Sequence, residues 1–154
     1  MHLLFVCTGN TCRSPLAEAI ARRMIADRAI PDLTVGSAGT SAWADAPASD
    51  GALLVALEHG VDLGDHRSRP LAQELVSSAQ LILTMGPHHL DRAEGLGGTG
   101  RSWLLTDYAG GTPRPVSDPF GGDLDVYRAT YVELEREIDA VLERIVADRS
   151  RTTR

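Results

Sequence analysis

Short apolar runs alternate with segments of helical periodicity along the whole chain. The apolar runs have the length of buried strands and predict strands at 2–6, 33–36, 81–84 and 101–105. Apolar residues spaced by three and four predict helices at 14–28, 49–59, 71–77, 87–93 and 123–148. Because parallel strands are joined by crossover helices, this alternation predicts an α/β fold with a parallel sheet.

The apolar faces of the first two helices can be located in the sequence. Pro15 suits the first turn of the helix at 14–28. The inward face of that helix is formed by Leu16, Ala17, Ile20 and Met24. In the helix at 49–59, Leu53, Leu54 and Leu57 are expected to point inward, and Gly60 is expected to end the helix.

The last predicted helix, at 123–148, carries an apolar stripe. Its members are Tyr127, Tyr131, Leu134, Ile138, Val141 and Ile145. A coiled-coil seam has the same spacing, but a single helix of this kind favours packing on a sheet. The residues at 149–154 are expected to form a flexible tail, and 1–148 a single domain. The glycine-rich segment 95–100 and the segment 107–122, rich in Pro and Gly, are expected to be loops.

The composition is that of a globular domain and narrows the choice of partners. Of the 154 residues, 43% are hydrophobic and 23% are charged, and no apolar run approaches the roughly 18 residues of a membrane span. The net charge of −6 argues against nucleic acid as a partner, because duplex binding requires cations. Two cysteines are too few for a disulfide scaffold, and the first residues have no signal-peptide pattern. A cytoplasmic protein without a membrane partner is therefore expected.

The candidate chemistry lies where the first strand ends, in the segment Cys7-Thr8-Gly9-Asn10-Thr11-Cys12-Arg13-Ser14. Parallel α/β sheets bind their ligands beyond the carboxyl ends of the strands. The seven backbone N–H groups from Thr8 to Ser14 can curl around one anion, and the helix start adds positive potential. Gly9 is expected to supply a backbone angle that other residues resist. The segment therefore predicts a phosphate-binding loop.

Two side chains make this loop a candidate for phosphoryl transfer. Arg13 offers a planar fork for two phosphate oxygens. The positive potential of the loop favours Cys7 as a thiolate nucleophile, and the Ser14 hydroxyl can donate to the sulfur when it later leaves. The alternative is an inert buried cysteine beside an unrelated arginine. The preceding strand, the glycine, the serine and the helix opening at Pro15 together favour the catalytic interpretation.

On these residues, the chain resembles the low-molecular-weight protein tyrosine phosphatase family, which shares its fold with thioredoxin-coupled arsenate reductases. The resemblance runs from Leu3 to about Ile145. It includes the segments Ser37-Ala38-Gly39-Thr40, His66-Arg67-Ser68 and Ser117-Asp118-Pro119-Phe120-Gly121-Gly122. The resemblance implies a three-layer sandwich with a four-stranded parallel sheet flanked by helices. It also implies a cysteinyl-phosphate intermediate and neither metal nor cofactor.

The resemblance assigns roles outside the loop as well. One carboxyl group can protonate the leaving group and then activate water, and the general acid of the family matches Asp118. Without the resemblance, this aspartate before a proline could simply begin a turn. Asn10, Ser37 and His66 match residues that form a supporting hydrogen-bond network with the Ser14 position. The remaining histidines lack partners at metal-ligand spacing and are expected on the surface; they are His2, His59, His88 and His89.

The expected substrate is a phosphorylated protein side chain. Tyrosine phosphatases of the family usually have a large aliphatic residue at the position of Thr11 and two aromatic residues after Asp-Pro. Here Phe120 is followed by Gly121. Both departures match the bacterial protein arginine phosphatase branch, whose loop reads Cys-Thr-Gly-Asn-Thr-Cys-Arg-Ser. Phosphoarginine is therefore favoured over phosphotyrosine, with Thr11 and Phe120 as specificity residues.

Two other functions fit the residues less well. An arsenate reductase relays oxidation through cysteines outside the loop, whereas the second cysteine of this chain, Cys12, lies inside it. A non-catalytic anion-binding module would not need Cys7, Arg13 and Asp118 together.

The protein is expected to be a monomer.

Overall fold

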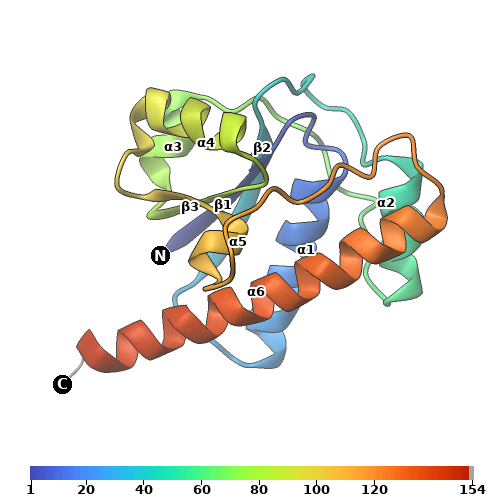
Figure 1. Ribbon diagram of the computed structural model, residues 1–154. Helices are drawn as coiled ribbons and strands as arrows, with labels where there is room; N and C mark the ends of the chain where they lie inside the picture. Colours follow the sequence, from blue (N-terminus) through green and yellow to red (C-terminus); the bar gives the residue numbers. More distant parts are fainter. Residues whose placement is uncertain (153–154) are drawn as a thin grey trace.

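A four-stranded parallel sheet with helices on both faces forms the centre of the computed structural model, which describes residues 1–152 (Figure 1). The strands are β1 (His2–Cys7), β2 (Thr34–Gly39), β3 (Leu81–Thr84) and β4 (Ser102–Leu104). Their order across the sheet is β2-β1-β3-β4, with all neighbours parallel. The expected three-layer α/β sandwich is confirmed. The chain moves outward from β1 to β2 and then crosses to β3, so β1 ends at the point where ligands of such sheets bind.

The alternating side chains of β1 belong to two separate cores, because the strand is buried on both faces. Leu3, Phe5 and Cys7 lie in the larger core, and Leu4 and Val6 lie in the smaller one. The larger core is covered by α1 (Arg13–Asp27), α2 (Asp50–Glu58), α5 (Leu105–Tyr108) and α6 (Leu124–Thr152). The smaller core is covered by α3 (Gln73–Ser78) and α4 (Pro87–Ala93). Cys7 therefore lies on the face of the sheet that α1 covers.

The inward face of α2 differs from the expected one. Leu54 and Leu57 are exposed and Leu53 is only partly buried, whereas the buried residues are Ala52, Val55 and Ala56. The reason is the close approach of α2 to α6. A Cβ atom on Gly51 would lie 2.4 Å from the ring of Tyr127, so only small residues fit between the two helices. The expectation that all three leucines point inward was wrong because it considered hydrophobicity without size.

The apolar stripe of α6 is buried as expected and packs along α1 and α2, not in a coiled-coil seam (Figure 1). A flexible tail was expected at 149–154. This expectation was wrong for residues 149–152, because α6 continues past Asp148 to Thr152. The Arg149 guanidinium donates to the carbonyl oxygens of Pro31 and Asp32 at 2.6 and 2.9 Å, which fixes the last turns. Residues 153–154 lie outside the described residues.

Two segments that were expected to be loops contain helical turns. The helical turn η1 (Glu94–Gly98) continues directly from α4, with Gly97 in the left-handed region at a φ of 103°. Helix α5 begins at Leu105, which was expected to end the fourth strand, and it extends to Tyr108, inside the expected loop. Leu105 and Tyr108, which lie one turn apart, are both buried. Burial of these side chains overrides the weak helix propensity of the surrounding residues. Within residues 1–152, no helix has the length and apolarity needed to cross a bilayer.

Candidate active site

The loop after β1 carries Cys7 to the start of α1. Cys7 is almost fully buried, and its Sγ lies 2.9 Å from the Ser14 hydroxyl in the first turn of the helix. The backbone N–H groups of Gly9, Asn10, Thr11 and Cys12 have no acceptor within residues 1–152. Successive unpaired N–H groups at a helix start attract an anion. The sulfur and the anion site therefore belong to the same loop.

Asn10 holds this loop in shape. It is fully buried, and its Nδ2 donates to the hydroxyl oxygens of Ser14 at 2.7 Å and Ser37 at 3.0 Å. Its Oδ1 accepts from the Arg69 backbone N–H at 3.0 Å, and its carbonyl oxygen accepts from His66 Nε2 at 2.7 Å. Because the Ser14 oxygen accepts from Asn10, the Ser14 proton is free to donate to Cys7 Sγ. The four residues expected to support the loop are thus brought together.

The glycine that the loop requires is not the expected one. Gly9 has no left-handed backbone; Asn10 adopts it instead, with a φ of 56°. Asn adopts this region more readily than most other residues that carry a Cβ. The close approach occurs at Gly39 of β2, where a Cβ atom would lie 2.4 Å from the Thr8 carbonyl oxygen and 2.9 Å from the Asn10 nitrogen. The expectation that Gly9 has a special backbone angle was therefore wrong. The glycine that the loop requires is Gly39, because a side chain there would clash with the loop backbone.

Arg13 and Asp118 meet over the loop. The Arg13 side chain is buried, and its Nη1 donates to the Val116 carbonyl oxygen at 2.9 Å. Its Nη2 lies 3.6 Å from Asp118 Oδ2. The Asp118 carboxylate is half exposed and also accepts from the Phe120 backbone N–H at 3.0 Å, which fixes its orientation. The segment between α5 and α6 therefore brings its carboxylate to the anion site, which the sequence alone could not establish.

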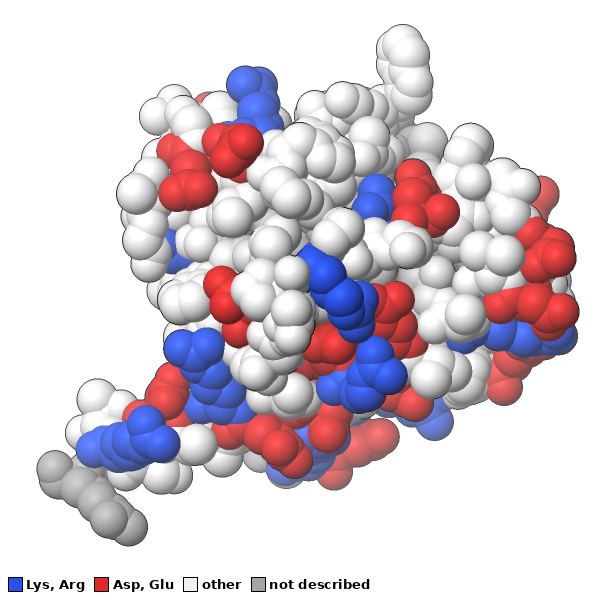
Figure 2. All heavy atoms as spheres, viewed as in Figure 1, with Lys and Arg blue, Asp and Glu red and all other residues white. Residues whose placement is uncertain are grey.

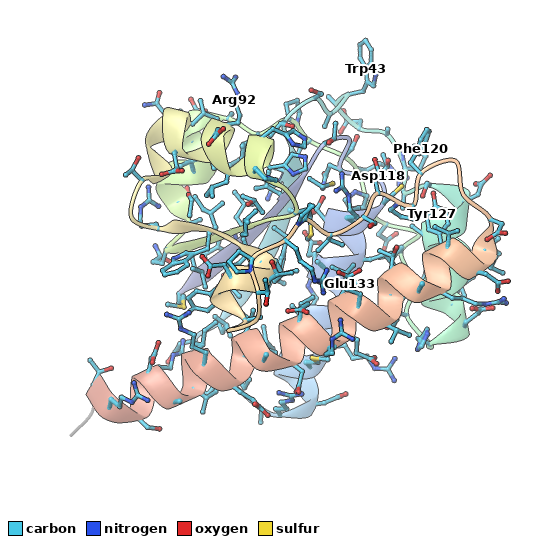
Figure 3. All side chains as sticks on the ribbon, in the orientation of Figure 1. Trp43, Arg92, Asp118, Phe120, Tyr127 and Glu133 are labelled. Atoms are coloured by element: carbon cyan, nitrogen blue, oxygen red, sulfur yellow. The ribbon has the colours of Figure 1, made fainter. Side chains whose placement is uncertain are left out.

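A pocket of about 310 Å³ opens directly over Cys7. Its lining residues are Cys7, Thr8, Gly9, Thr11, Cys12, Arg13, Ser41, Trp43, Asp118 and Phe120. Trp43 and Phe120 are 85% and 72% exposed, and Figure 3 shows Trp43 projecting outward above Asp118 and Phe120. Ser41 and Trp43 were not anticipated, although both follow β2 at the carboxyl edge of the sheet. Figure 2 shows charged side chains gathered along α6, whereas the surface above it is mostly uncharged.

Cys12 is anchored at the back of the loop. Its Sγ lies 3.1 Å from the Ser49 hydroxyl and 3.4 Å from the Tyr127 hydroxyl. The Ser49 backbone N–H also donates to the Thr11 carbonyl oxygen at 2.9 Å. Burial, reinforced by the contact with Cys12, raises the pKa of Tyr127 to about 12, so the phenol keeps its proton. The starts of α2 and α6 thus brace the loop from behind.

One histidine that was expected on the surface belongs to the site. His89 is fully buried, and its Nε2 lies 2.8 Å from the Thr8 hydroxyl oxygen. His59 and His88 are exposed and His2 is partly buried. The available signal was the helical spacing of His89 and Ala93, which places both on the inner face of α4. Within residues 1–152, no group of three or more His, Cys, Asp or Glu side chains could hold a metal ion.

Comparisons with known proteins agree with this geometry. The family model described as low molecular weight phosphotyrosine protein phosphatase matches residues 2–151. The protein-arginine-phosphatase of Bacillus subtilis (strain 168) is 38% identical over 151 residues, which cover 97% of this chain and 99% of that protein. The low molecular weight protein-tyrosine-phosphatase PtpB of Staphylococcus haemolyticus is also 38% identical, over 135 residues that cover 87% of this chain and 92% of that protein.

A solved structure is similar over nearly the whole fold. It is that of YwlE arginine phosphatase, a C7S mutant with a phosphorylated active site serine. Its TM-score is 0.92 at 36% sequence identity, and the match covers 97% of this chain and 99% of that chain.

Proposed function

Because the chain belongs to the low molecular weight phosphotyrosine protein phosphatase family and is a cysteine-dependent protein phosphatase, we propose that its preferred substrate is phosphoarginine in proteins. The main observation behind this proposal is that Thr11 lines the same pocket as Cys7, Arg13 and Asp118. Similarity to arginine phosphatases over 97% of the chain supports it.

We propose that the reaction has two steps. The Cys7 thiolate attacks the phosphorus while the loop N–H groups and Arg13 bind the phosphoryl oxygens. The phosphorus–nitrogen bond breaks, and Asp118 gives its proton to the departing guanidinium nitrogen. In the second step Asp118 takes a proton from water, the resulting hydroxide attacks the cysteinyl phosphate, and the thiolate leaves with phosphate released. The phosphorylated active site serine in the mutant YwlE structure supports a phosphoryl acceptor at this position.

The other loop residues have preparatory roles in this mechanism. Ser14, which lies 2.9 Å from Cys7 Sγ, stabilises the thiolate both before attack and as a leaving group. Asn10, Ser37 and His66 hold the loop in the shape that binds the anion. These roles account for the burial of Asn10, Ser14 and Ser37.

Thr11 supports the preference for phosphoarginine. Its side chain lines the pocket, and its only hydrogen-bond contact within residues 1–152 is a long one, 3.9 Å to Cys12 Sγ. The hydroxyl is therefore available to a substrate. A phosphorylated guanidinium carries N–H donors beside the phosphorus, and a threonine oxygen can accept from one of them. Leaving such a donor unpaired costs about 1–3 kcal/mol, or roughly tenfold to a hundredfold in discrimination.

Phosphotyrosine is the second candidate substrate. Trp43 and Phe120 at the mouth of the pocket offer aromatic surface to a phenyl ring. A protein-tyrosine-phosphatase, PtpB, is also among the relatives that are 38% identical. The same chemistry would serve this substrate, since phenolate also needs a proton as it leaves.

A comparison of kcat/KM on phosphoarginine and phosphotyrosine peptides tests the proposal. The wild type is expected to prefer phosphoarginine. Thr11→Val removes the hydroxyl at constant shape and should lower kcat/KM on phosphoarginine about tenfold or more while sparing phosphotyrosine. Thr11→Ser, which retains the hydroxyl, is the matched control. Equal losses on both substrates in Thr11→Val, or a wild type that prefers phosphotyrosine, would contradict the assignment.

We further propose that the protein acts in the cytoplasm as a monomer. Both cysteines are free, and the reducing cytosol would keep a thiolate nucleophile reduced. Light scattering tests the monomer, and fractionation of the cells that make the protein tests its location.

A further inference from the structure

The buried histidine behind the loop has one ring nitrogen without a partner. His89 Nε2 contacts Thr8 Oγ1, but its Nδ1 has no hydrogen-bond partner within residues 1–152. Burial, helped by the neighbouring His88 and Arg13 and opposed by Asp118, lowers the pKa of His89 to about 4. The ring is therefore neutral at physiological pH and carries one proton.

The unpartnered Nδ1 indicates which nitrogen carries that proton. A proton on Nδ1 would leave a buried N–H donor unpaired, whereas a proton on Nε2 leaves only an unused acceptor. Orphaned buried N–H groups are the rarer of the two in native proteins. The Nε2–H group of His89 therefore donates to Thr8 Oγ1.

This hydrogen bond determines what the Thr8 hydroxyl can do. Thr8 Oγ1 also accepts from Arg13 Nη2 at 3.5 Å, so both of its lone pairs face donors. Its single proton must point elsewhere, and Thr8 lines the pocket next to Cys7. The Thr8 backbone is fixed as well, because its carbonyl oxygen accepts from the Ser41 N–H at 2.9 Å.

We propose that His89 is a positioning residue that turns the Thr8 hydroxyl toward the bound phosphoryl group, where it donates to a phosphoryl oxygen. The inference rests on the proposed phosphatase function, since the phosphoryl group is the acceptor. It extends the anion site from the loop backbone and Arg13 to α4, on the opposite face of the sheet from α1.

A double-mutant cycle with p-nitrophenyl phosphate as substrate and inorganic phosphate as competing ligand tests this role. Thr8→Val removes the hydroxyl at constant shape, and His89→Met removes the ring donor. Each is expected to weaken phosphate binding and lower kcat/KM about tenfold, the factor of one hydrogen bond to a charged oxygen. The double variant should be no worse than either single one. His89→Gln, which restores an N–H donor at similar reach, should recover most of the loss.

Two results would overturn this role of His89. If His89→Met costs the same factor in the Thr8→Val background as in the wild type, His89 acts through packing alone and the proposal fails. Nitrogen-15 NMR of the wild type is a second test that requires no variant. We expect the proton of His89 on Nε2, and a proton on Nδ1 would overturn the proposal. A wild type that does not hydrolyse p-nitrophenyl phosphate would refute the proposed function. The phosphate affinities and the NMR spectrum would still decide the role of His89.

Discussion

Replacing Asn10 by alanine should test how far one side chain holds the phosphate-binding loop. The substitution removes two donated hydrogen bonds and one accepted hydrogen bond in a fully buried position. At about 1 kcal/mol each, these contribute about 3 kcal/mol. The left-handed backbone, at a φ of 56°, adds about 1 kcal/mol for a residue with a Cβ and no local bond. We expect Asn10→Ala to lower the free energy of unfolding by about 4 kcal/mol.

The chain offers a matched control for the backbone part of this loss. Asp32 has nearly the same backbone, with a φ of 55°, but it is exposed and makes no side-chain hydrogen bond within residues 1–152. Asp32→Ala should therefore cost only about 1 kcal/mol. The difference between the two variants isolates the hydrogen-bond network from the backbone.

Urea unfolding followed by tryptophan fluorescence measures both variants. With a slope of about 2 kcal/mol per molar urea, Asn10→Ala should move the midpoint by about 2 M and Asp32→Ala by about 0.5 M. Asn10→Ala should also lose activity, because the Ser14 oxygen loses the donor that directs its proton to Cys7. Equal midpoint shifts in the two variants, or full activity in Asn10→Ala, would refute this account of the network.

Three further predictions concern the chemistry and its pH dependence. Cys7→Ser should keep its affinity for phosphate but lose turnover by several orders of magnitude, and mass spectrometry should detect any phosphoserine that forms. Asp118→Asn should slow substrates with poor leaving groups by about 10²–10⁴-fold and activated aryl phosphates much less; an equal loss on both would make Asp118 structural. The folded pKa of His89, about 4, lies below the unfolded value of roughly 6.5, so the unfolded state binds the proton first as pH falls. The free energy of unfolding should therefore drop by about 1–2 kcal/mol between about pH 7 and pH 5, and His89→Gln should flatten that dependence in urea unfolding at the two pH values.

The sequence predicted those parts of the fold that depend on local periodicity. The strand at Leu81–Thr84, the helix at Pro87–Ala93 and the buried stripe of α6 match the structure residue by residue. The prediction of β2 was less accurate, because that strand runs to Gly39. The last residues of β2 pair with the end of β1, where Gly39 lies opposite Cys7. Such pairing cannot be predicted from the sequence of one strand alone. The local hydrophobic pattern therefore predicted the helices and strands, whereas contacts with residues far away in the chain determine where they end.

The errors at the site have the same origin. Gly9 was expected to take the special backbone angle, but Asn10 takes it, and side-chain hydrogen bonds join Asn10 to Ser37 and Arg69, far along the chain. His89 was expected on the surface because no partner stands near it in the sequence, while its partner, Thr8, lies 81 positions away. Cys7, Arg13 and Ser14 were expected to lie together, and they do, since all three belong to one short segment of the sequence.

The residues proposed to support the chemistry of this pocket differ in character from those proposed to set its substrate preference. Asn10, Ser14 and Ser37 are buried and joined by several hydrogen bonds, so a change at any of them disturbs the others. Trp43 and Phe120 are largely exposed, and within residues 1–152 the Thr11 side chain makes a single, long hydrogen-bond contact, so each side chain can change without disturbing the loop. A substitution among these three alters what the pocket contacts while Cys7 and its supports remain in place. A pocket built in this way can change its substrate contacts without losing its fold, and relatives named for arginine and for tyrosine substrates are both 38% identical to this chain.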